Sequence, residues 1–451
     1  MLPAVLIFST LLTLVFGIPT ISVKGSKFFT SDGNQFFVKG IAYQLVPEDP
    51  LIDGTQCTAD ANLMKTLGTN AIRVYHVDPT ANHTPCMNAF SAAGIYVFID
   101  LDTFTTAINQ DKPEWNETQL QAFEKVMDAF HSFDNVAGFF IGNEVITTGA
   151  GSPAAPYVKA ATRDLKSYRD SKGYRNIPVG YSAADIASLR PMLQNYLACG
   201  SDAEAAIDFF SLNAYEWCGA STYQTSGYAG LNSYVQNYSI PIFFSETGCN
   251  TAPPRTFTDQ AAIFGPEMSP YWSGSIIYEW IQENNAYGLI SYGAHVDPSS
   301  PNAPPDGWPR SGTPQPVQPD FDNLKSQWAA VKPSSVSASA YTPSNSAPAC
   351  PASTAGTWVV DANAALPGAP NGAAKATGTS ATSGSSASST AKSSSASRTT
   401  ASTGSISVFA MASTTTAAVV ATTTSLGSRT FMPMALLLTV CWLAIGGTMP
   451  F

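Results

Sequence analysis

The sequence has 451 residues, of which 44% are hydrophobic and 12% charged, and its formal net charge at pH 7 is −10. An acidic chain is repelled by a phosphate backbone, which argues against nucleic acid as a partner. The 4 histidines lack the paired spacing of metal ligands, and the G-x-S-x-G elbow of serine hydrolases is missing. We therefore expect neither a metal site nor a cofactor.

The first 17 residues form a short apolar stretch that ends in small residues, although its start lacks the usual positive charge. This pattern predicts a secretory signal peptide at residues 1–17, which the mature protein loses. We therefore expect an exported protein whose folded part begins at residue 18.

Short runs rich in β-branched and aromatic residues then alternate with segments of helical periodicity. In the segment 117–133, for example, apolar side chains recur at helical spacing with charges opposite, and Asn116 precedes its first turn. The expected strands cover residues 36–44, 70–78, 94–102, 136–145, 177–185, 207–217, 240–248 and 273–283.

Eight such strand and helix units in about 250 residues predict an α/β fold, the (β/α)8 TIM barrel, whose buried parallel strands are apolar along their length. The alternative is a doubly wound open sheet, but its G-x-G-x-x-G motif does not follow the first strand. In a barrel, function lies at the C-terminal ends of the strands.

The composition changes near residue 334, and between 372 and 405 almost every residue is Gly, Ala, Ser or Thr. Such a segment cannot bury enough apolar surface to fold. We expect the barrel domain to span residues 18–335 with a short extension to Cys350, followed by a disordered, O-glycosylated stalk over residues 351–428.

The apolar residues 429–451 end the chain without a charge after Arg429. A transmembrane anchor would usually be followed by basic residues. The upstream small residues and polar spacer instead favour a GPI attachment signal that is removed, with the anchor on a Ser, Gly or Ala between Gly404 and Ser428. The protein is then expected on the outer leaflet of the plasma membrane, in the cell wall, or both.

Export also gives the cysteines a role. Cys441 lies in the tail, and an even number remains, which predicts disulfides of undetermined connectivity. These cysteines are Cys57, Cys86, Cys199, Cys218, Cys249 and Cys350. Three sequons for N-glycosylation, at Asn82, Asn116 and Asn237, are compatible with export.

Two of the apolar runs end in a carboxylate, GFFIGNEV at Glu144 and IPIFFSETG at Glu246. As the fourth and seventh strands of a barrel, they can present both side chains across its mouth. Glycoside cleavage with retention needs a protonated carboxyl and an ionised one about 5 Å apart. We predict Glu144 as the acid and base and Glu246 as the nucleophile, although a salt bridge at the barrel end would also explain one such residue.

Other carboxylates compete for these roles. Glu216 and Glu279 each lie in a Tyr-Glu-Trp triplet, and alternation along a strand turns them away if the preceding tyrosines face a sugar. We expect Glu216 and Glu279 to be structural partners of buried arginine or amide groups.

Aromatic, amide and carboxylate side chains at several strand ends are typical of a sugar cleft, because aromatic faces stack on pyranose rings and polar groups bind hydroxyls. The candidates are Gln44, Tyr75, Asp100, Asn143, Tyr215 and Tyr278.

At these residues the sequence resembles the fungal GPI-anchored β-1,3-glucanosyltransferases of glycoside hydrolase family 72. The matching stretches are CTADANLMKTLGTNAIRVYHVDPT, GIYVFIDL, GFFIGNEV, GYSAADIASLR, YEWCG, FFSETGCN and YEWIQENNAYGLISYG. The resemblance implies cleavage of an internal β-1,3-glucan bond and transfer of the new reducing end to another chain, which elongates cell-wall glucan. The partners would be glucan donor and acceptor chains, and we expect a monomer.

By the same resemblance, Asn143 and Glu144 are similar to the family's Asn-Glu pair and Glu246 to its nucleophile. Gln44, Tyr75, Asp100, Tyr215 and Tyr278 correspond to donor-side contacts, and Asp185 and Arg190 to acceptor-side contacts. The implied disulfides join Cys57 to Cys86, Cys199 to Cys350 and Cys218 to Cys249. Some members carry a Cys-rich glucan-binding module after the barrel, whereas this chain has only Cys350 there before the tail, as in the module-free branch.

Transfer and hydrolysis share one covalent intermediate and differ in whether a sugar hydroxyl or water resolves it. Spacing and composition do not decide between them, so a secreted endo-β-1,3-glucanase is the enzymatic alternative. A non-catalytic glucan-binding wall protein is a further alternative, which the presence of both glutamates disfavours.

Overall fold

The computed structural model describes residues 17–46 and 48–368. The predicted GPI tail, nearly all of the signal peptide and most of the stalk lie outside these residues. Within the described ranges, we find no helix that combines the length and the apolar character needed to cross a membrane.

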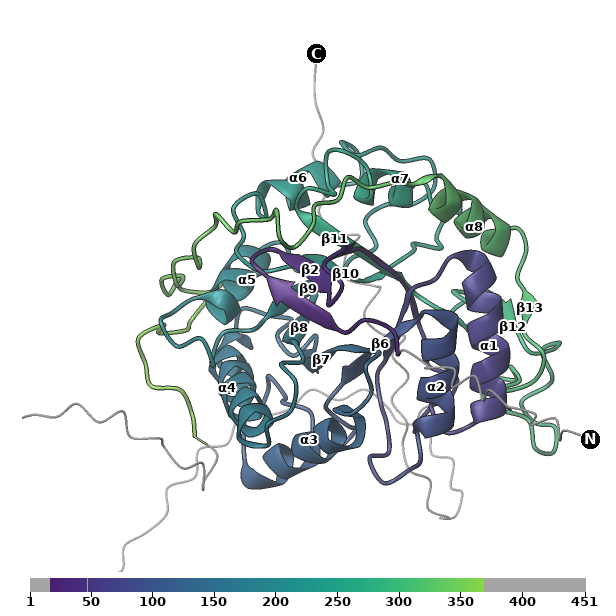
Figure 1. The fold of residues 1–451 in the computed structure, drawn as a ribbon, viewed down its shortest axis with the longest axis horizontal. Coiled ribbons are helices and arrows are strands. Elements are labelled where there is room, and N and C mark those ends of the chain that lie inside the picture. The colour runs from purple at the N-terminus through teal and green to yellow at the C-terminus, as the bar shows by residue number, and fades with distance from the viewer. Residues whose placement is uncertain (1–16, 47, 369–451) are drawn as a thin grey trace, which may run out of the picture. The chain divides into compact units, whose positions relative to one another are not determined.

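Eight parallel strands form a closed barrel, which confirms the predicted fold class (Figure 1). Each predicted run supplies one strand. In barrel order from the first, the strands are β4 (Val38–Ala42), β5 (Ala71–Val74), β6 (Tyr96–Asp100), β7 (Val136–Asn143), β8 (Val179–Ala184), β9 (Phe209–Asn213), β10 (Ile242–Thr247) and β11 (Trp272–Ile277).

Helices surround the barrel, as Figure 1 shows. Asn116 caps the helix predicted after it: its side chain accepts from the Gln119 backbone N–H at 3.1 Å, and the Gln119 side chain accepts from the Asn116 backbone at 3.0 Å. The helices are α1 (Gly54–Leu67), α2 (Thr84–Ala93), α3 (Glu117–Phe130), the 3₁₀ turn η1 (Ser152–Ala154), α4 (Ala155–Ser171), α5 (Arg190–Ala198), α6 (Tyr228–Ser233), α7 (Asp259–Ile263) and α8 (Asp320–Ala330). Two short strands, β12 (Ile290–Ser291) and β13 (Gln315–Pro316), pair in a loop.

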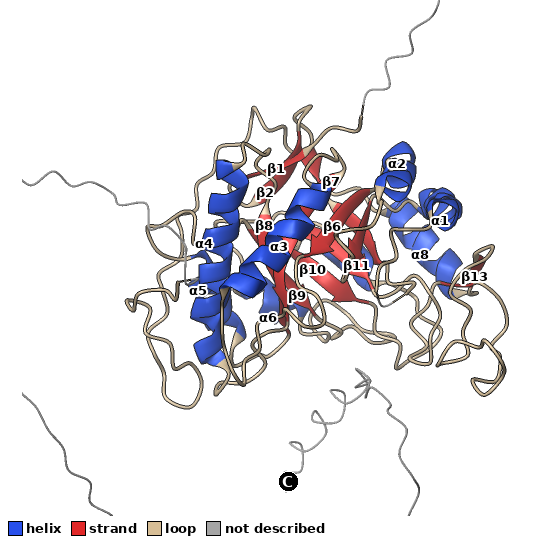
Figure 2. Cartoon of the chain, turned by 90° about the horizontal axis from the view of Figure 1, so that it is seen from below, coloured by secondary structure: helices blue, strands red, loops and turns tan. Residues whose placement is uncertain are grey.

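A small antiparallel sheet that the sequence analysis did not predict closes one end of the barrel. It consists of β1 (Ile21–Lys24), β2 (Lys27–Thr30) and β3 (Gln35–Phe36), and Figure 2 shows β1 and β2 at that end. From β2, the Phe28 ring lies 5.7 Å from Phe209 and 5.9 Å from Phe243, centroid to centroid. These rings, with Phe98 and Phe140, form an aromatic plug in the barrel interior.

The three disulfides are those that the family resemblance implies: Cys57–Cys86, Cys199–Cys350 and Cys218–Cys249. The second one joins the residue after α5 to the C-terminal extension across 151 positions of sequence. It therefore fixes the extension to the outside of the barrel.

Beyond Cys350 the chain continues to pack against the barrel, so the predicted start of the stalk at residue 351 is too early. Trp358 is fully buried, with its ring 5.5 Å from that of Tyr196 in α5. The Val359 backbone N–H donates to Ser152 Oγ at 3.0 Å. A composition average over this segment does not register the single buried tryptophan.

Candidate active site

Polar side chains from neighbouring strands meet at the C-terminal end of the barrel. In the parallel register, Asn143 of β7 lies beside Ser182 of β8, and Asn213 of β9 lies beside Glu246 of β10. Because all strands point the same way, these side chains share one rim.

Glu246 lies in this rim, 5% exposed, and is surrounded by donors. The Tyr75 hydroxyl donates to Oε1 at 2.9 Å, and the Tyr215 hydroxyl donates to Oε2 at 2.8 Å. Arg73 Nη1 also approaches Oε1, at 3.5 Å. Both carboxylate oxygens are therefore held in place, which orients the group before any substrate arrives.

Burial raises the pKa of Glu246 to about 7. The Arg73 cation opposes this rise, the nearby charge of Glu144 adds to it, and the hydrogen bonds from Tyr215 and Tyr75 oppose it. The Glu246 carboxyl therefore changes between its neutral and ionised forms near neutral pH, and the ionised form is the nucleophile.

Arg73, which the sequence analysis missed, organises this rim from below. It is fully buried, and its guanidinium donates to Asp100 through Nε at 3.0 Å and through Nη2 at 2.7 Å. It also reaches Asn143 Oδ1 at 2.9 Å and lies 4.3 Å from the Tyr75 ring centroid. A lone charge inside the apolar run AIRV of β5 was the available signal, because a buried arginine needs partners.

Glu144 directly follows β7 and is half-buried. Its φ of 49° lies in the left-handed region, which costs a non-glycine residue about 1 kcal/mol. Its backbone N–H donates to the Ser182 carbonyl at 2.8 Å, and Asn213 Nδ2 donates to Oε1 at 2.9 Å. The unusual backbone conformation is thus fixed by its neighbours.

Asn213 is the second residue that the sequence analysis missed. Its Nδ2 also donates to Asn143 Oδ1, at 3.1 Å, while its Oδ1 accepts from Ser182 at 3.0 Å and from Ser245 at 2.8 Å. The two hydroxyl donors fix the orientation of the amide, so its N–H groups must face Glu144 and Asn143.

Aromatic rings line the rim near Glu246. The rings of Tyr215, Tyr278 and Tyr287 meet edge to face, with centroids 5.4 to 6.4 Å apart. Gln44 Nε2 donates to the Tyr278 hydroxyl at 2.7 Å and to Glu279 at 2.6 Å. Among the predicted sugar contacts, Tyr75, Tyr215, Tyr278, Gln44 and Asn143 therefore lie together around the two glutamates.

Asp100 is placed differently. It is 2% exposed, and both of its oxygens accept from Arg73, beneath the rim. In this arrangement it neutralises the arginine and holds it in position. Its predicted contact with sugar stays a prediction.

Asp185 and Arg190 form a second polar group at the end of β8. Arg190 is 8% exposed, contacts Asp185, and lies 3.4 Å from Glu216 Oε1. Burial lowers the pKa of Arg190, and Glu216 opposes that effect.

The structural partners expected for the two competing glutamates are confirmed. Glu216 pairs with Arg190, and the fully buried Glu279 accepts from Gln44 and, at 2.7 Å, from Asn285. Burial, together with the neighbouring Glu283, raises the pKa of Glu279 to about 8.

Comparison with known proteins indicates which reaction the site is suited to catalyse. The sequence matches the family described as glucanosyltransferase, glycoside hydrolase family 72, over residues 12–301, which is more than half of the chain. The chain belongs to this family. Members transfer glycosyl groups, so the rim around Glu144 and Glu246 is the candidate centre for that reaction.

Two curated relatives share much of the sequence. The 1,3-beta-glucanosyltransferase gas2 of Schizosaccharomyces pombe is 41% identical over 366 residues, which cover 78% of this chain and 76% of that protein. The 1,3-beta-glucanosyltransferase GAS2 of Saccharomyces cerevisiae is 39% identical over 375 residues, which cover 78% of this chain and 64% of that protein.

Solved structures agree with the fold. Saccharomyces cerevisiae Gas2p in complex with laminaritriose and laminaritetraose matches with a TM-score of 0.70 at 40% identity, over 78% of each chain. A mutant of the same protein, in complex with laminaritetraose and laminaripentaose, matches with a TM-score of 0.69 at 39% identity and covers 78% of this chain and 75% of that one.

Proposed function

We propose that this chain is a 1,3-β-glucanosyltransferase, which cleaves an internal β-1,3 bond of one glucan chain and transfers the new reducing end to another. The observation that supports this most is Glu246, buried and held by Tyr75, Tyr215 and Arg73, on the same rim as the half-buried Glu144. The two relatives named as 1,3-beta-glucanosyltransferases and the laminari-oligosaccharides bound to Gas2p point to the same linkage.

In the first half of the reaction, Glu246 attacks the anomeric carbon while Glu144 donates its proton to the departing glycosidic oxygen. The bond that forms joins Glu246 to the sugar, and the bond that breaks releases the rest of the donor chain with a new hydroxyl. Inversion at the anomeric carbon leaves a covalent glycosyl-enzyme.

In the second half, the ionised Glu144 removes the proton from the 3-hydroxyl of an acceptor chain, and that oxygen displaces Glu246. A second inversion restores the β configuration and regenerates both carboxyl groups. Asn213 Nδ2, which donates to Glu144 Oε1 at 2.9 Å, orients this carboxyl at the rim.

Donor sugar contacts are assigned to Gln44, Tyr75, Asn143, Tyr215 and Tyr278, which lie around the glutamates. Asp100 acts beneath them, through Arg73. Asp185 and Arg190 are assigned to the acceptor side, where a bound sugar hydroxyl gains the advantage of proximity over water.

The protein acts outside the cell in this proposal. A signal peptide at residues 1–17 directs export, and a GPI anchor attached within the stalk holds the barrel, as a monomer without a cofactor, at the plasma membrane or in the wall. Since residues 351–366 pack on the barrel, the stalk begins after them.

The test is product analysis. The secreted domain, ended at residue 368, is incubated with a reduced β-1,3-linked pentasaccharide, and products are separated by length over time. We expect products longer than the starting chain. Only shorter products, in proportion to new reducing ends, would make the protein an endo-glucanase and overturn the proposal.

The assignment of Glu246 has its own test. We expect Glu246→Gln to abolish product formation while the fold is kept, and the exposed Glu267→Gln to retain full activity as the matched control. Near-normal turnover in a folded Glu246→Gln variant would remove this residue as the nucleophile.

A further inference from the structure

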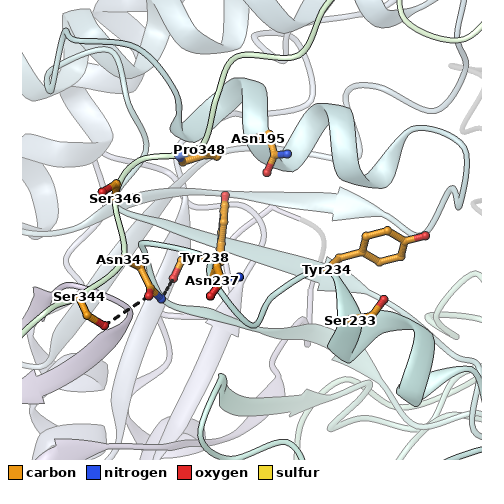
Figure 3. A pocket seen from close by; sticks show the side chains of 9 residues that line it. All are labelled: Asn195, Ser233, Tyr234, Asn237, Tyr238, Ser344, Asn345, Ser346 and Pro348. Atoms are coloured by element: carbon orange, nitrogen blue, oxygen red, sulfur yellow. Dashed lines mark hydrogen bonds between the residues drawn. The ribbon is translucent and has the colours of Figure 1, made fainter.

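A pocket of about 490 Å³ lies on the outside of the barrel, away from the two glutamates, and Figure 3 shows it. Its volume is typical of small-molecule sites. Three parts of the chain form its walls: α5, the end of α6 with the residues after it, and the extension before Cys350. The lining residues are Asn195, Ser233, Tyr234, Asn237, Tyr238, Ser344, Asn345, Ser346 and Pro348.

The walls of this pocket are fixed by hydrogen bonds. The Tyr238 hydroxyl donates to the Gln194 carbonyl in α5 at 2.8 Å, and Asn345 Nδ2 donates to the Tyr238 carbonyl at 2.9 Å. The Cys199–Cys350 disulfide holds the extension nearby. The pocket therefore exists because the extension is bound to the barrel at this place.

Its lining has the chemistry of a neutral sugar site. All lining side chains are amides, hydroxyls, tyrosines or a proline, and none is charged. The Tyr234 ring is 49% exposed and can stack on a pyranose face. Amides and hydroxyls suit the hydroxyls and the acetamide of an N-acetylhexosamine.

One lining residue also supplies a covalent link to such a sugar. Asn237 begins the sequon Asn237-Tyr238-Ser239, is exposed, and lies between Asn345 and Tyr234 in the view of Figure 3. No hydrogen bond among the pocket residues drawn there involves its side chain. The residue that would be modified is thus itself part of the pocket wall.

We propose that Asn237 carries an N-linked glycan whose first N-acetylglucosamine lies in this pocket and attaches the extension to the barrel. The modification joins Asn237 Nδ2 to C1 of a sugar delivered as a lipid-diphosphate-linked oligosaccharide. The amide loses a proton, and the lipid diphosphate leaves. The glycan rests on export of the chain and is independent of glucan transfer.

The other two sequons differ in their surroundings. Asn116 Oδ1 caps α3, and Asn82 Oδ1 accepts from the Thr84 backbone N–H at 3.1 Å. Neither residue lines the pocket around Asn237. They supply matched controls, because a glycan on either residue would start outside this pocket.

The experiment secretes the full chain from a fungal host and compares wild type with Ser239→Ala, which destroys the sequon but keeps Asn237. Thr84→Ala and Thr118→Ala remove the other two sequons in the same way. We expect the intact mass of Ser239→Ala to fall by one glycan and its glucan transfer to be unchanged. An unchanged mass would overturn the proposal.

Placement of the sugar is tested with an endoglycosidase that cuts between the first two sugars. On the native wild-type protein, the glycan at Asn237 should resist cleavage by the enzyme, and denaturation should make it cleavable. The Tyr234→Ala variant should carry the same glycan and lose it to the enzyme already in the native state. Equal release before and after denaturation in wild type would show that the sugar lies outside the pocket.

Discussion

Opposing influences act on the carboxylate of Glu246, and burial is the largest of them. Burial favours its neutral form and raises its pKa to about 7, while Arg73 and two tyrosine hydroxyls favour the ionised form. The same balance makes the stability and the activity of the protein respond to pH in opposite directions.

The stability of the fold should therefore depend on Glu246 as pH changes. The pKa of Glu246 is raised from 4.5 to about 7 by folding, so its contribution is fully present below pH 4.5 and is lost as the pH rises through 7. Relative to wild type, Glu246→Gln should gain about 3 kcal/mol of unfolding free energy between pH 4 and pH 8. Denaturant unfolding of both proteins at the two pH values measures this gain, and a constant difference would contradict it.

Activity depends on the ionised form of the same carboxylate, so it should rise with pH where stability falls. Tyr75→Phe removes a hydrogen bond to the ionised form, so the pKa of Glu246 should rise and the acid limb of kcat/KM should move up by about one pH unit. Tyr278→Phe is the matched control, because its hydroxyl accepts from Gln44. A shift as large in the control would mean that the tyrosine ring environment, and not the bond to Glu246, sets the limb.

At the scale of elements, the barrel strands were predictable because parallel buried strands read as continuous apolar runs. All eight runs supplied a strand, and two of them ended in the glutamates. The β1–β3 sheet was missed even though KFFTSDGNQFF contains two aromatic runs around an Asp-Gly turn. Its strands have only two to four residues, which is too short for a period to stand out.

Site residues were predictable from the sequence only where the residue type and its place after an apolar run indicate a role. Glu144 and Glu246 follow apolar runs, but the roles of Arg73 and Asn213 come from contacts between strands far apart in sequence, such as Arg73 with Asn143 and Asn213 with Glu144. Asp100 was expected to face a sugar, and its pairing with Arg73 was invisible for the same reason. Register across the barrel, which no local pattern encodes, decides these contacts.

The aromatic plug gives an element-scale prediction. Phe28 is fully buried among Phe98, Phe209 and Phe243, so Phe28→Ala should lower the free energy of unfolding by about 3–5 kcal/mol. KM should stay unchanged below the melting temperature, because Phe28 enters the plug from the β1–β3 sheet and makes none of the hydrogen bonds that hold Glu246. Ile52→Ala, at a residue 54% exposed, should change stability little. A KM shift in Phe28→Ala would show that the plug also positions the rim.

At the scale of the whole molecule, the folded unit extends further along the chain than composition indicates. Residues 351–366 are rich in small and polar side chains, but Trp358 and Val360 bury their side chains against the barrel. Together with the Cys199–Cys350 disulfide, this segment fixes to the barrel the first part of what composition predicts as stalk.

Truncation tests this boundary. A chain ended at Cys350 should melt at a lower temperature than one ended at residue 368, and Trp358→Ala in the longer chain should lose about 3–5 kcal/mol of unfolding free energy. Val359→Ala is the control, since that side chain is 45% exposed. Equal melting temperatures for the two lengths would place the boundary of the folded unit at Cys350 after all.

The aromatic plug also constrains how a polymer can meet the enzyme. With Phe28 and its neighbours filling the barrel below Glu246, the site is a well with a floor, and a glucan strand cannot thread through it from end to end. A strand that reaches Glu246 must enter and leave over the same rim. Cleavage of an internal bond, as proposed above, then requires the donor strand to lie across this rim.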